Sequence, residues 1–253
     1  MKIVVSENDK ILGQKTAEHI ECLINQTIGE KGYARILVST GASQFTTFEN
    51  LIAMDIDWSK IELFHLDEYI GMDETHPASF IKYLKERFIN KLKVNFKKIH
   101  FVDLTIGVEN TIAKLNEEVK QGVIDVGVIG IGENAHIAFN DPPADFDCED
   151  GFKIVTLDEA CRRQQLGEGW FPTLDDVPKE AISMTVRQIM KCTHIISAVP
   201  YKVKAKAVHD TLTSKEITNM IPATILRTHD NWTLYIDKES ASMIDADHIE
   251  KYC

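Results

Sequence analysis

The sequence predicts an α/β fold in three layers, with a mainly parallel sheet covered by helices on both faces. Short apolar segments rich in β-branched residues alternate with longer segments in which apolar residues recur with helical period. This alternation is typical of strand–helix–strand units, whose parallel strands are buried on both faces. No internal repeat, Gly/Ser linker or shift in composition divides the 253 residues. We therefore expect a single domain over residues 1–253.

Seven apolar runs are the predicted strands, at residues 3–5, 35–39, 61–66, 99–102, 126–131, 194–199 and 233–236. The predicted helices lie between them, at residues 8–28, 77–90, 107–120 and 202–212. Ser6 stands where the N-cap of the first helix is expected. In a sheet of this kind ligands bind outside the carboxyl ends of the strands, so the loops at those ends form the candidate site.

The regular alternation breaks between Asn140 and Pro178, where the chain is polar and contains several prolines and glycines. Long irregular insertions in compact domains are often functional lids. We expect a lid at residues 144–172 that becomes ordered over a bound ligand. A surface excursion with a short helix around residues 158–165 is an alternative that the pattern leaves open.

Composition and charge argue against several classes of function. Hydrophobic residues make up 44% and charged residues 26% of the chain, as in ordinary folded proteins. The formal net charge of −11 argues against nucleic-acid and anionic-membrane partners, which need a positive protein face. The first residues carry charge beside a short apolar run and predict neither a signal peptide nor a membrane span. Five scattered cysteines without CxxC spacing favour reduced thiols, so we expect a cytoplasmic protein.

The segment Ser39-Thr40-Gly41-Ala42-Ser43 follows the second predicted strand and precedes a helical segment. A turn of this kind offers backbone N–H groups and hydroxyls to a phosphate near the start of a helix. Because such turns are common, the loop by itself only makes Thr40, Gly41, Ala42 and Ser43 candidates for anion binding.

Two adjacent carboxylates, Asp67 and Glu68, stand at the end of the third predicted strand. Neighbouring side chains on a strand point in opposite directions, so one carboxylate can face a pocket while the other pairs with a structural partner. One of the two is therefore a candidate base. The alternative is a polar turn that precedes a helix with Pro77 at its first position.

The predicted strand at residues 126–131 leads into Gly130-Ile131-Gly132-Glu133-Asn134-Ala135-His136, and Asp141-Pro142-Pro143 follows. The Gly-x-Gly-x-x-Ala spacing imitates a dinucleotide fingerprint, but the prolines stop any following helix after about one or two turns. A dinucleotide site needs a long helix there, so we expect no nucleotide cofactor. His136 between Asn134 and Asp141 is more typical of an oriented acid/base group, because such partners fix the tautomer and tune the pKa of a histidine.

The order of these segments resembles the glucosamine-6-phosphate deaminase/isomerase family and its 6-phosphogluconolactonase relatives. The motifs are STGAS, LDEY with HPAS, GIGENAHIAFNDPP and a downstream Lys202, and they span residues 35–228. The resemblance implies a modified Rossmann-like fold of the deaminase/lactonase type. It also implies a small phosphosugar substrate and chemistry that uses no metal and no cofactor.

The resemblance assigns roles to residues already singled out. Asp67 corresponds to the base that moves a proton between C2 and C1 of the open-chain sugar. His136 corresponds to the group that opens the pyranose ring, and Asp141 stands where the family usually has a supporting Glu. Asn134 stands where members have Asp or Asn. The phosphate-binding positions of the family are matched by Gly41, Ala42, Ser43 and Lys202.

Two departures from the family concern the lid helix and regulation. The deaminases bind phosphate with an Arg that follows a first Arg in that helix. Arg162 matches the first, but the second position falls near Gly167, beside the insertion Gly167-Glu168-Gly169-Trp170. How the phosphate is held is therefore open. Val155 lies near a position where allosterically regulated members have Lys, so we expect no control by an amino-sugar effector.

The resemblance makes conversion of glucosamine 6-phosphate to fructose 6-phosphate and ammonia the leading hypothesis, in the hydrolase class that acts on C–N bonds. A 6-phosphogluconolactonase is the alternative, although Asp-Glu-Tyr at residues 67–69 resembles the deaminases, and lactonases commonly have Asp-Glu-Arg there. A phosphosugar sensor without catalysis is a third hypothesis. The sequence does not distinguish between hexosamines, and it leaves a homo-oligomer open.

Overall fold

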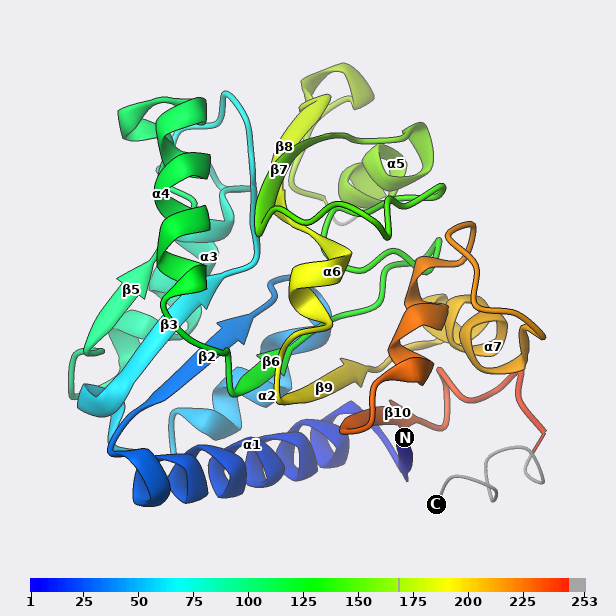
Figure 1. Ribbon diagram of the computed structural model, residues 1–253. Coiled ribbons are helices and arrows are strands. Elements are labelled where there is room, and N and C mark those ends of the chain that lie inside the picture. The colour runs from blue at the N-terminus through cyan, green and yellow to red at the C-terminus, as the bar shows by residue number, and fades with distance from the viewer. Residues whose placement is uncertain (168, 246–253) are drawn as a thin grey trace.

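The main sheet of the protein is parallel throughout (Figure 1). The structure is a computed structural model that describes residues 1–167 and 169–245. In this part of the chain the sheet is formed by β1 Lys2–Ser6, β2 Ala34–Val38, β3 Ile61–His65, β5 Lys98–His100, β6 Val126–Val128, β9 His194–Val199 and β10 Trp232–Asp237. Their spatial order is β1-β10-β9-β6-β2-β3-β5. All the predicted strands belong to this sheet, so the predicted α/β class is confirmed.

Helices cover both faces of the main sheet and make the fold three layers thick (Figure 1). One face carries α1 Asp9–Lys31, α2 Phe45–Leu51 and α3 Phe80–Arg87, and the other carries α4 Val108–Lys120, α6 Val186–Ile189 and α7 Ala205–Thr213. Strand side chains alternate between the two cores. Ile36 and Val38 of β2 pack in the core with α1 and α2, whereas Leu37 packs in the core with α4. Burial on both faces explains why the strands have continuous apolar sequences.

Helix α1 begins later than the sequence suggested. Asn8 is its N-cap, because the Asn8 side chain accepts a hydrogen bond from the N–H of Ile11 at 3.0 Å. Ser6 is the last residue of β1, so the prediction of Ser6 as N-cap is wrong. The helix has 23 residues. No helix in the described part of the chain combines such length with the apolar character needed to cross a membrane.

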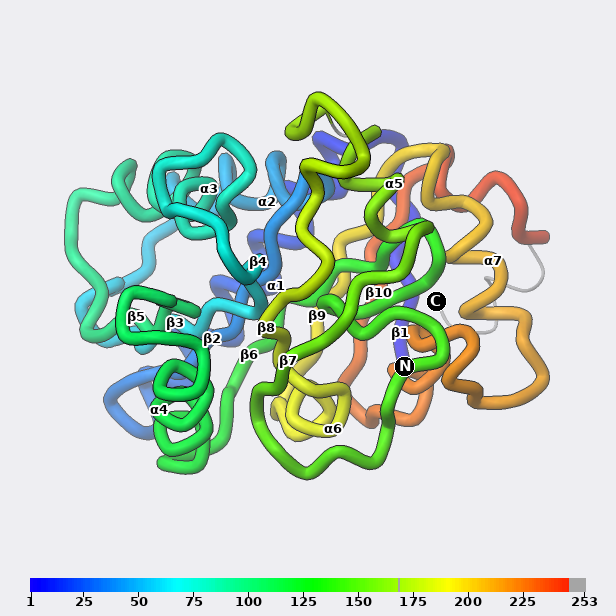
Figure 2. The backbone as a smooth tube through the Cα atoms, turned by 90° about the horizontal axis from the view of Figure 1, so that it is seen from above, coloured from blue at the N-terminus to red at the C-terminus, as the bar shows by residue number. Residues whose placement is uncertain are grey.

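The region that looks irregular in sequence contains β7 Phe152–Thr156 and α5 Glu159–Gly167. Strand β7 joins β8 Glu180–Met184 and β4 Asp67–Tyr69, which lie outside that region, in a second, antiparallel sheet of order β4-β8-β7. This second sheet lies over the carboxyl ends of the central strands (Figures 1 and 2). The predicted lid therefore includes β7 and α5, and the alternative of a short helix corresponds to α5. Within the lid, Glu168 lies outside the described residues.

The direction in which strands are added to the main sheet changes between β2 and β6. From β2 the chain moves outward to β3 and β5, whereas β6 is followed on its other side by β9 and β10. A change of this kind leaves a crevice outside the carboxyl ends of the two central strands. The loops after β2 and β6 are the first and third segments that the sequence analysis singled out.

Candidate active site

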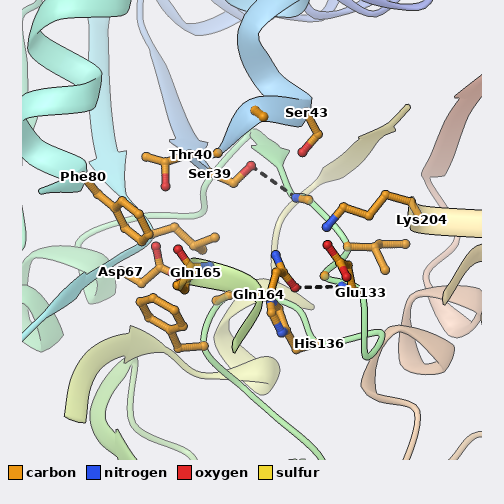
Figure 3. A pocket seen from close by; sticks show the side chains of 18 of the residues that line it. Ser39, Thr40, Ser43, Asp67, Phe80, Glu133, His136, Gln164, Gln165 and Lys204 are labelled. Atoms are coloured by element: carbon orange, nitrogen blue, oxygen red, sulfur yellow. Dashed lines mark hydrogen bonds between the residues drawn. The ribbon is translucent and has the colours of Figure 1, made fainter. Parts of the chain in front are cut away.

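A cavity opens where the strand order changes, at the carboxyl ends of β2, β3 and β6 (Figure 3). Its walls come from the loops after these strands, from the turn after β9 and from α5. These segments are far apart in the chain. The parallel sheet brings them together because all its strands end at the same edge.

The loop after β2 provides one wall of the cavity with hydroxyl and backbone N–H groups. Thr40, Gly41, Ala42 and Ser43 all line the cavity. Gly41 has a φ of 95°, which residues with a side chain rarely adopt. Its carbonyl accepts a hydrogen bond from the Tyr83 hydroxyl at 2.8 Å, which holds the loop against α3. The donors of the loop are thus preorganised for an anion.

Asp67 and Glu68 face opposite sides of β4. Asp67 lines the cavity, and only 5% of it is exposed. Burial raises the pKa of Asp67 well above its ordinary value, and the nearby Glu68 charge raises it further. Glu68 points away and accepts hydrogen bonds from Ser79 Oγ and the N–H of Ile81, both at 2.9 Å. The sequence left open which of the two carboxylates faces the pocket, and in the structure it is Asp67.

His136 forms part of the cavity wall and is paired with Asp141 behind it. Its Nδ1 lies 3.0 Å from Asp141 Oδ1. The same oxygen accepts a hydrogen bond from Asn134 Nδ2 at 3.1 Å, and Asp141 Oδ2 accepts one from the N–H of Asp158 at 3.2 Å. Burial raises the pKa of Asp141, but the interactions with His136, Asn134 and Asp158 outweigh it and hold that pKa below its ordinary value. Asp141 is therefore an ionised partner that orients the imidazole.

The space for the imidazole is created by Gly132. A Cβ at this position would lie 2.2 Å from His136 Nε2, which no side chain tolerates. Since Nδ1 faces Asp141, Nε2 is the ring nitrogen on the cavity side, next to Gly132. Ala135 and Ala138 have φ of 65° and 51°, so the backbone bends sharply on both sides of the histidine.

The thiol of Cys161 approaches the same pair from α5. Burial raises the pKa of this thiol, and the nearby carboxylate of Asp141 raises it further. His136, Asp141 and Cys161 offer three potential metal ligands that lie within 4.8 Å of one another. The sequence analysis did not single out Cys161, because nothing in the cysteine spacing connects it with His136.

The cation of the cavity is Lys204 and not Lys202. Both lysines belong to the 3₁₀ turn Lys202–Lys204 after β9, but Lys202 is exposed while Lys204 is buried and lines the cavity. Figure 3 shows the side chain of Lys204 reaching the same end of the cavity as Ser43 and Glu133. Lys202, which was expected to bind phosphate, therefore does not line the cavity, whereas Lys204 does. The buried stripe of α7, which includes Ala205 and Val208, was the available signal, because Lys204 continues it.

Arg162 does not line the cavity. Its Nε donates a hydrogen bond to the carbonyl of Val177 at 3.2 Å, and its Nη2 donates to that of Leu174. Arg162 therefore fastens the loop between α5 and β8 and is unavailable to a ligand in this arrangement, which is a departure from the expected phosphate-binding role.

Helix α5 instead presents Gln164 and Gln165 to the cavity. Gln164 Oε1 accepts a hydrogen bond from the N–H of Glu133 at 3.0 Å, and Gln165 Oε1 accepts one from the Tyr69 hydroxyl at 2.7 Å. Both glutamines were missed in the sequence, since polar residues in a helix are usually on its solvated side. They connect the predicted lid with the loop after β6 and with β4.

The arrangement provides a carboxylate, an imidazole and an ammonium around one small-molecule cavity. Among the described residues that line it, the charged groups besides His136 are Asp67, Glu133 and Lys204. A buried carboxylate of raised pKa suits proton abstraction, an imidazole backed by a carboxylate suits proton transfer to oxygen, and a lysine beside an N–H-rich loop suits a phosphate.

Comparison with known proteins identifies the family of this chain. The family described as glucosamine-6-phosphate isomerases/6-phosphogluconolactonase matches residues 7–235. A glucosamine-6-phosphate deaminase of Thermoanaerobacter sp. (strain X514) is 32% identical over 257 aligned positions, covering 99% of this chain and 98% of that protein. One of Clostridium botulinum (strain Eklund 17B / Type B) is 32% identical over 251 positions, covering 97% of each.

Solved structures show the same relationship. A monomeric glucosamine-6-phosphate deaminase superposes with a TM-score of 0.84 at 29% identity, over 96% of this chain and all of that one. A 6-phosphogluconolactonase from Thermotoga maritima superposes with a TM-score of 0.77 at 16% identity, over 94% of this chain and 99% of that one, which is a likeness of fold. The family match covers most of the chain, and the first and third motifs come together at the cavity. The chain therefore belongs to the glucosamine-6-phosphate isomerase/6-phosphogluconolactonase family.

Proposed function

We propose that this protein converts glucosamine 6-phosphate and water to fructose 6-phosphate and ammonia. The observation that carries the proposal is the position of Asp67 in the same cavity as the His136–Asp141 pair, with Lys204 at the phosphate end. Because water cleaves a C–N bond in this reaction, the activity falls in the hydrolase class that acts on such bonds. We also propose that the chain acts as one domain whose lid covers the bound sugar.

The first step of the proposed reaction opens the sugar ring. His136 takes the proton of the C1 hydroxyl and returns a proton to the ring oxygen, while Asp141 stabilises the charged imidazolium that exists between the two transfers. Asn134 holds the Asp141 carboxylate in place at 3.1 Å. The product of this step is an open-chain aldehyde with an ammonium group at C2.

The second step moves a proton between neighbouring carbons. Asp67 takes the C2 proton, and the C1 carbonyl oxygen takes up a proton while the ammonium group at C2 releases one, which gives an enolamine. Asp67 then returns a proton to C1, and C2 becomes an iminium carbon. Water adds to that carbon and ammonia leaves, which gives the ketose. The raised pKa of Asp67 supports this role, because a stronger base is closer in pKa to a carbon acid.

The phosphate end of the cavity explains how an acidic protein holds an anion. The N–H groups of Gly41 and Ala42, the hydroxyls of Thr40 and Ser43, and the ammonium of Lys204 all belong to this end of the wall. The proposal assigns no phosphate contact to Arg162 or Lys202. One lysine and an N–H-rich turn then do the work of the arginine that deaminases place in the lid helix.

A lactonase is less well supported than a deaminase. Opening a lactone requires no base at C2, so Asp67 would have no role in that reaction. The Thermoanaerobacter and Clostridium botulinum relatives, at 32% identity, bear the name glucosamine-6-phosphate deaminase, whereas the Thermotoga maritima lactonase is 16% identical.

The test is ammonia release from glucosamine 6-phosphate, followed with a coupled dehydrogenase. We expect turnover without added metal, with no loss of rate in the presence of EDTA. In deuterated water, label should enter C1 of the product, because a carboxylate exchanges its proton with solvent between abstraction and return. Absence of ammonia together with rapid opening of 6-phosphogluconolactone would make the protein a lactonase.

A further inference from the structure

Three side chains at the base of the cavity carry the three kinds of donor atom that zinc prefers. They are the imidazole of His136, the carboxylate of Asp141 and the thiol of Cys161, and one donor atom of each lies within 4.8 Å of the other two. Nδ1 and Asp141 Oδ1 are only 3.0 Å apart. Zinc sites in proteins commonly combine histidine, cysteine and a carboxylate at about 2.0–2.3 Å from the metal. Small shifts of these side chains would bring all three donors to such distances.

The surrounding hydrogen bonds would hold these donors in place. Asn134 and the N–H of Asp158 each donate to one oxygen of Asp141, at 3.1 and 3.2 Å. The N–H of Cys161 donates to Asp158 Oδ1 at 2.6 Å, which fixes the first turn of α5 and with it the thiol. Outer contacts of this kind orient metal ligands and add to metal affinity.

The group is also balanced in charge for a divalent cation. Cys161 is 1% exposed, and a buried ion is tolerated only where opposite charges compensate it. A thiolate and the carboxylate of Asp141 together neutralise a divalent cation, while His136 contributes a neutral nitrogen. Without a cation, burial and the nearby Asp141 carboxylate raise the pKa of the thiol, so it stays protonated.

We propose that His136, Asp141 and Cys161 form a binding site for a thiophilic divalent cation, zinc in the first place, and that its occupation switches the enzyme off. A sulfur and a nitrogen among three ligands select against Mg²⁺ and Ca²⁺, which prefer oxygen. His136 forms the cavity wall in front of the group, so the cation enters from the cavity past the imidazole.

The balance of protons explains why the bound cation would inhibit. Zinc forms bonds to the thiolate, to the carboxylate and to Nδ1, and no atom changes its oxidation state. The thiol proton leaves to solvent, and the proton on Nδ1 is replaced by one on Nε2. With Nε2 protonated and Nδ1 bound to metal, His136 can no longer accept the proton of the C1 hydroxyl. This inhibition rests on the proposed function, whereas zinc binding does not.

The binding experiment uses zinc chloride and the whole, untagged protein in competition with a chromophoric zinc chelator. We expect about one zinc per chain and, near neutral pH, release of about one proton per zinc in unbuffered solution. Outer contacts of a metal ligand typically contribute about 10- to 100-fold in affinity, so loss of the direct thiolate ligand in Cys161→Ser should weaken binding by at least about 100-fold.

Two further cysteine variants provide the control. Cys148→Ser removes a partly exposed thiol and Cys192→Ser removes a buried one elsewhere, and neither thiol belongs to a group of metal ligands in the described part of the chain. Both variants should bind zinc as the wild type does. Zinc should also raise the melting temperature of the wild type but not that of Cys161→Ser.

Inhibition provides the second measurement. Micromolar zinc should abolish ammonia release by the wild type, EDTA should restore it, and magnesium should have no effect. Cys161→Ser and Cys161→Ala should resist zinc. If the wild type binds no zinc, or if these variants bind it as tightly as the wild type, the site does not exist. If zinc binds as described but the protein releases no ammonia from glucosamine 6-phosphate, the proposed function fails and the site stands.

Discussion

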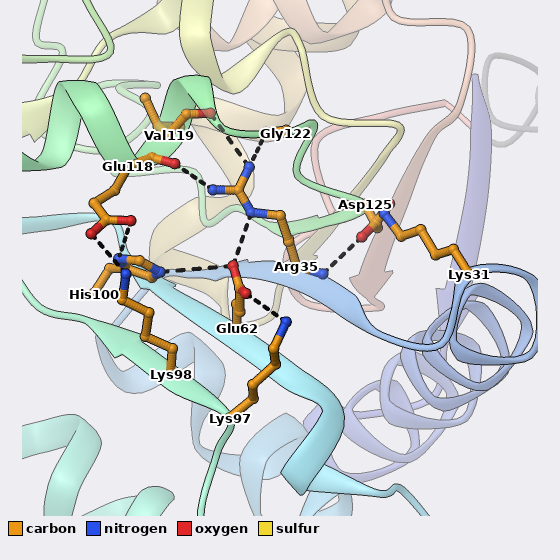
Figure 4. Close-up of polar contacts among 10 residues, drawn as sticks. All are labelled: Lys31, Arg35, Glu62, Lys97, Lys98, His100, Glu118, Val119, Gly122 and Asp125. Carbon is orange, nitrogen blue, oxygen red and sulfur yellow. Dashed lines mark hydrogen bonds and ion pairs between the residues drawn. The ribbon is translucent and has the colours of Figure 1, made fainter.

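In the described part of the chain, two buried histidines, His100 and His136, stand beside carboxylates, and only His136 lines the cavity at the carboxyl edge of the main sheet. His136 lies 3.0 Å from Asp141 at the carboxyl edge of the main sheet. His100 lies under α4, in a charged cluster formed by Arg35, Glu62, His100 and Glu118 together with Lys97 and Lys98 (Figure 4). In the charged cluster the nitrogens of His100 are 3.9 Å from Glu62 and 3.8 Å from Glu118.

The charged cluster uses its polar groups to hold elements together. Arg35 donates to the carbonyls of Glu118, Val119 and Gly122, which lie in and just after the last turn of α4. His100 stacks on Phe64, with ring centroids 4.1 Å apart. Burial and the charge of Lys98 lower the pKa of His100 to about 4 in spite of its two glutamates, so it is neutral at neutral pH.

The difference between the two regions lies in what surrounds the histidine and not in the presence of a carboxylate. At the cavity, a short contact to Asp141 orients one ring nitrogen while the other remains at the cavity wall. In the charged cluster, stacking and burial enclose the whole ring. A histidine beside a carboxylate is therefore a candidate for proton transfer only where a substrate can reach it.

The largest expected effect is on kcat, and it distinguishes Asp67 in the cavity from Glu62 in the charged cluster. Asp67→Asn should lower kcat by about 10²- to 10⁴-fold, the usual contribution of a positioned general base. Because the shape of the side chain is kept, KM should change little. Glu62→Gln in the charged cluster should leave kcat unchanged and lower the free energy of unfolding by about 1–3 kcal/mol, since it weakens bonds to charged partners. For both variants, steady-state ammonia release gives kcat and KM, and thermal unfolding gives the stability. A near-wild-type kcat in Asp67→Asn would exclude Asp67 as the base.

The two histidines provide the second test. His136→Gln should lower kcat by about 10²-fold, because only the small open-chain fraction of the substrate would react. His100→Gln should keep kcat within twofold of the wild type. The two variants are compared at saturating substrate, with circular dichroism as the control for folding. Equal losses of kcat in both variants would contradict the view that His136 transfers protons and His100 does not.

The two lysines after β9 give a smaller effect on substrate affinity. A hydrogen bond to a charged group contributes about 1.5–3 kcal/mol, so Lys204→Ala should raise KM by about 10- to 100-fold. The change in kcat should be smaller, because a phosphate remote from C1 and C2 is held similarly in the ground and transition states. Lys202→Ala is the matched control and should leave KM unchanged. A higher KM in Lys202→Ala than in Lys204→Ala would restore the assignment made from the sequence.

The stability of Asp67→Asn should depend on pH in a defined direction. The folded protein binds the Asp67 proton more tightly than the unfolded chain does, because its pKa is raised from 3.8. The associated stability is fully present below that value and is lost as the pH rises through the raised pKa. The variant should therefore melt above the wild type, with a difference that grows as the pH rises above 3.8, until Asp67 is ionised in the folded protein as well. For a chain of this size about 1 kcal/mol corresponds to roughly 2–4 °C. A difference that shrinks as the pH rises would contradict the buried, cavity-facing position of Asp67.

The smallest expected effect concerns the predicted lid at residues 144–172. Binding of phosphosugar should slow amide exchange in residues 144–172 and change the fluorescence of Trp170, while exchange in the charged cluster stays the same. The comparison is made with and without saturating fructose 6-phosphate, the product of the proposed reaction. Unchanged exchange and fluorescence would mean that this segment is a fixed wall and not a lid.

Much of the fold could be predicted because its determinants are local. The strands of the main sheet are buried on both faces, so each appears as a continuous apolar run. Asp67 could be singled out because it directly follows such a run, and His136 and Asp141 because they lie in the polar segment after another. Assigning the proton-transfer roles required the family resemblance, and these roles remain predictions.

The remaining features depend on contacts that the local sequence does not contain. The second sheet pairs Glu68 with Ile182 and Ile154 with Ile182, which are far apart in the chain. Arg162 could be matched to a family position, but its hydrogen bonds to carbonyls beyond α5 depend on how the following loop folds. Which of Lys202 and Lys204 lines the cavity depends on the turn that joins β9 to α7, because a shift of a residue or two decides which lysine is buried.

The absence of a side chain at Gly132 has a consequence for how this family is recognised in genomes. Its glycine pattern after a strand matches the dinucleotide fingerprint letter for letter in the first positions, yet the selective pressure is different. In a nucleotide-binding protein the glycine leaves space for a pyrophosphate, whereas here it leaves space for the imidazole of His136. The motif and His136 should therefore be inherited as one unit, and a descendant that loses the histidine should soon accept larger residues in place of the glycine.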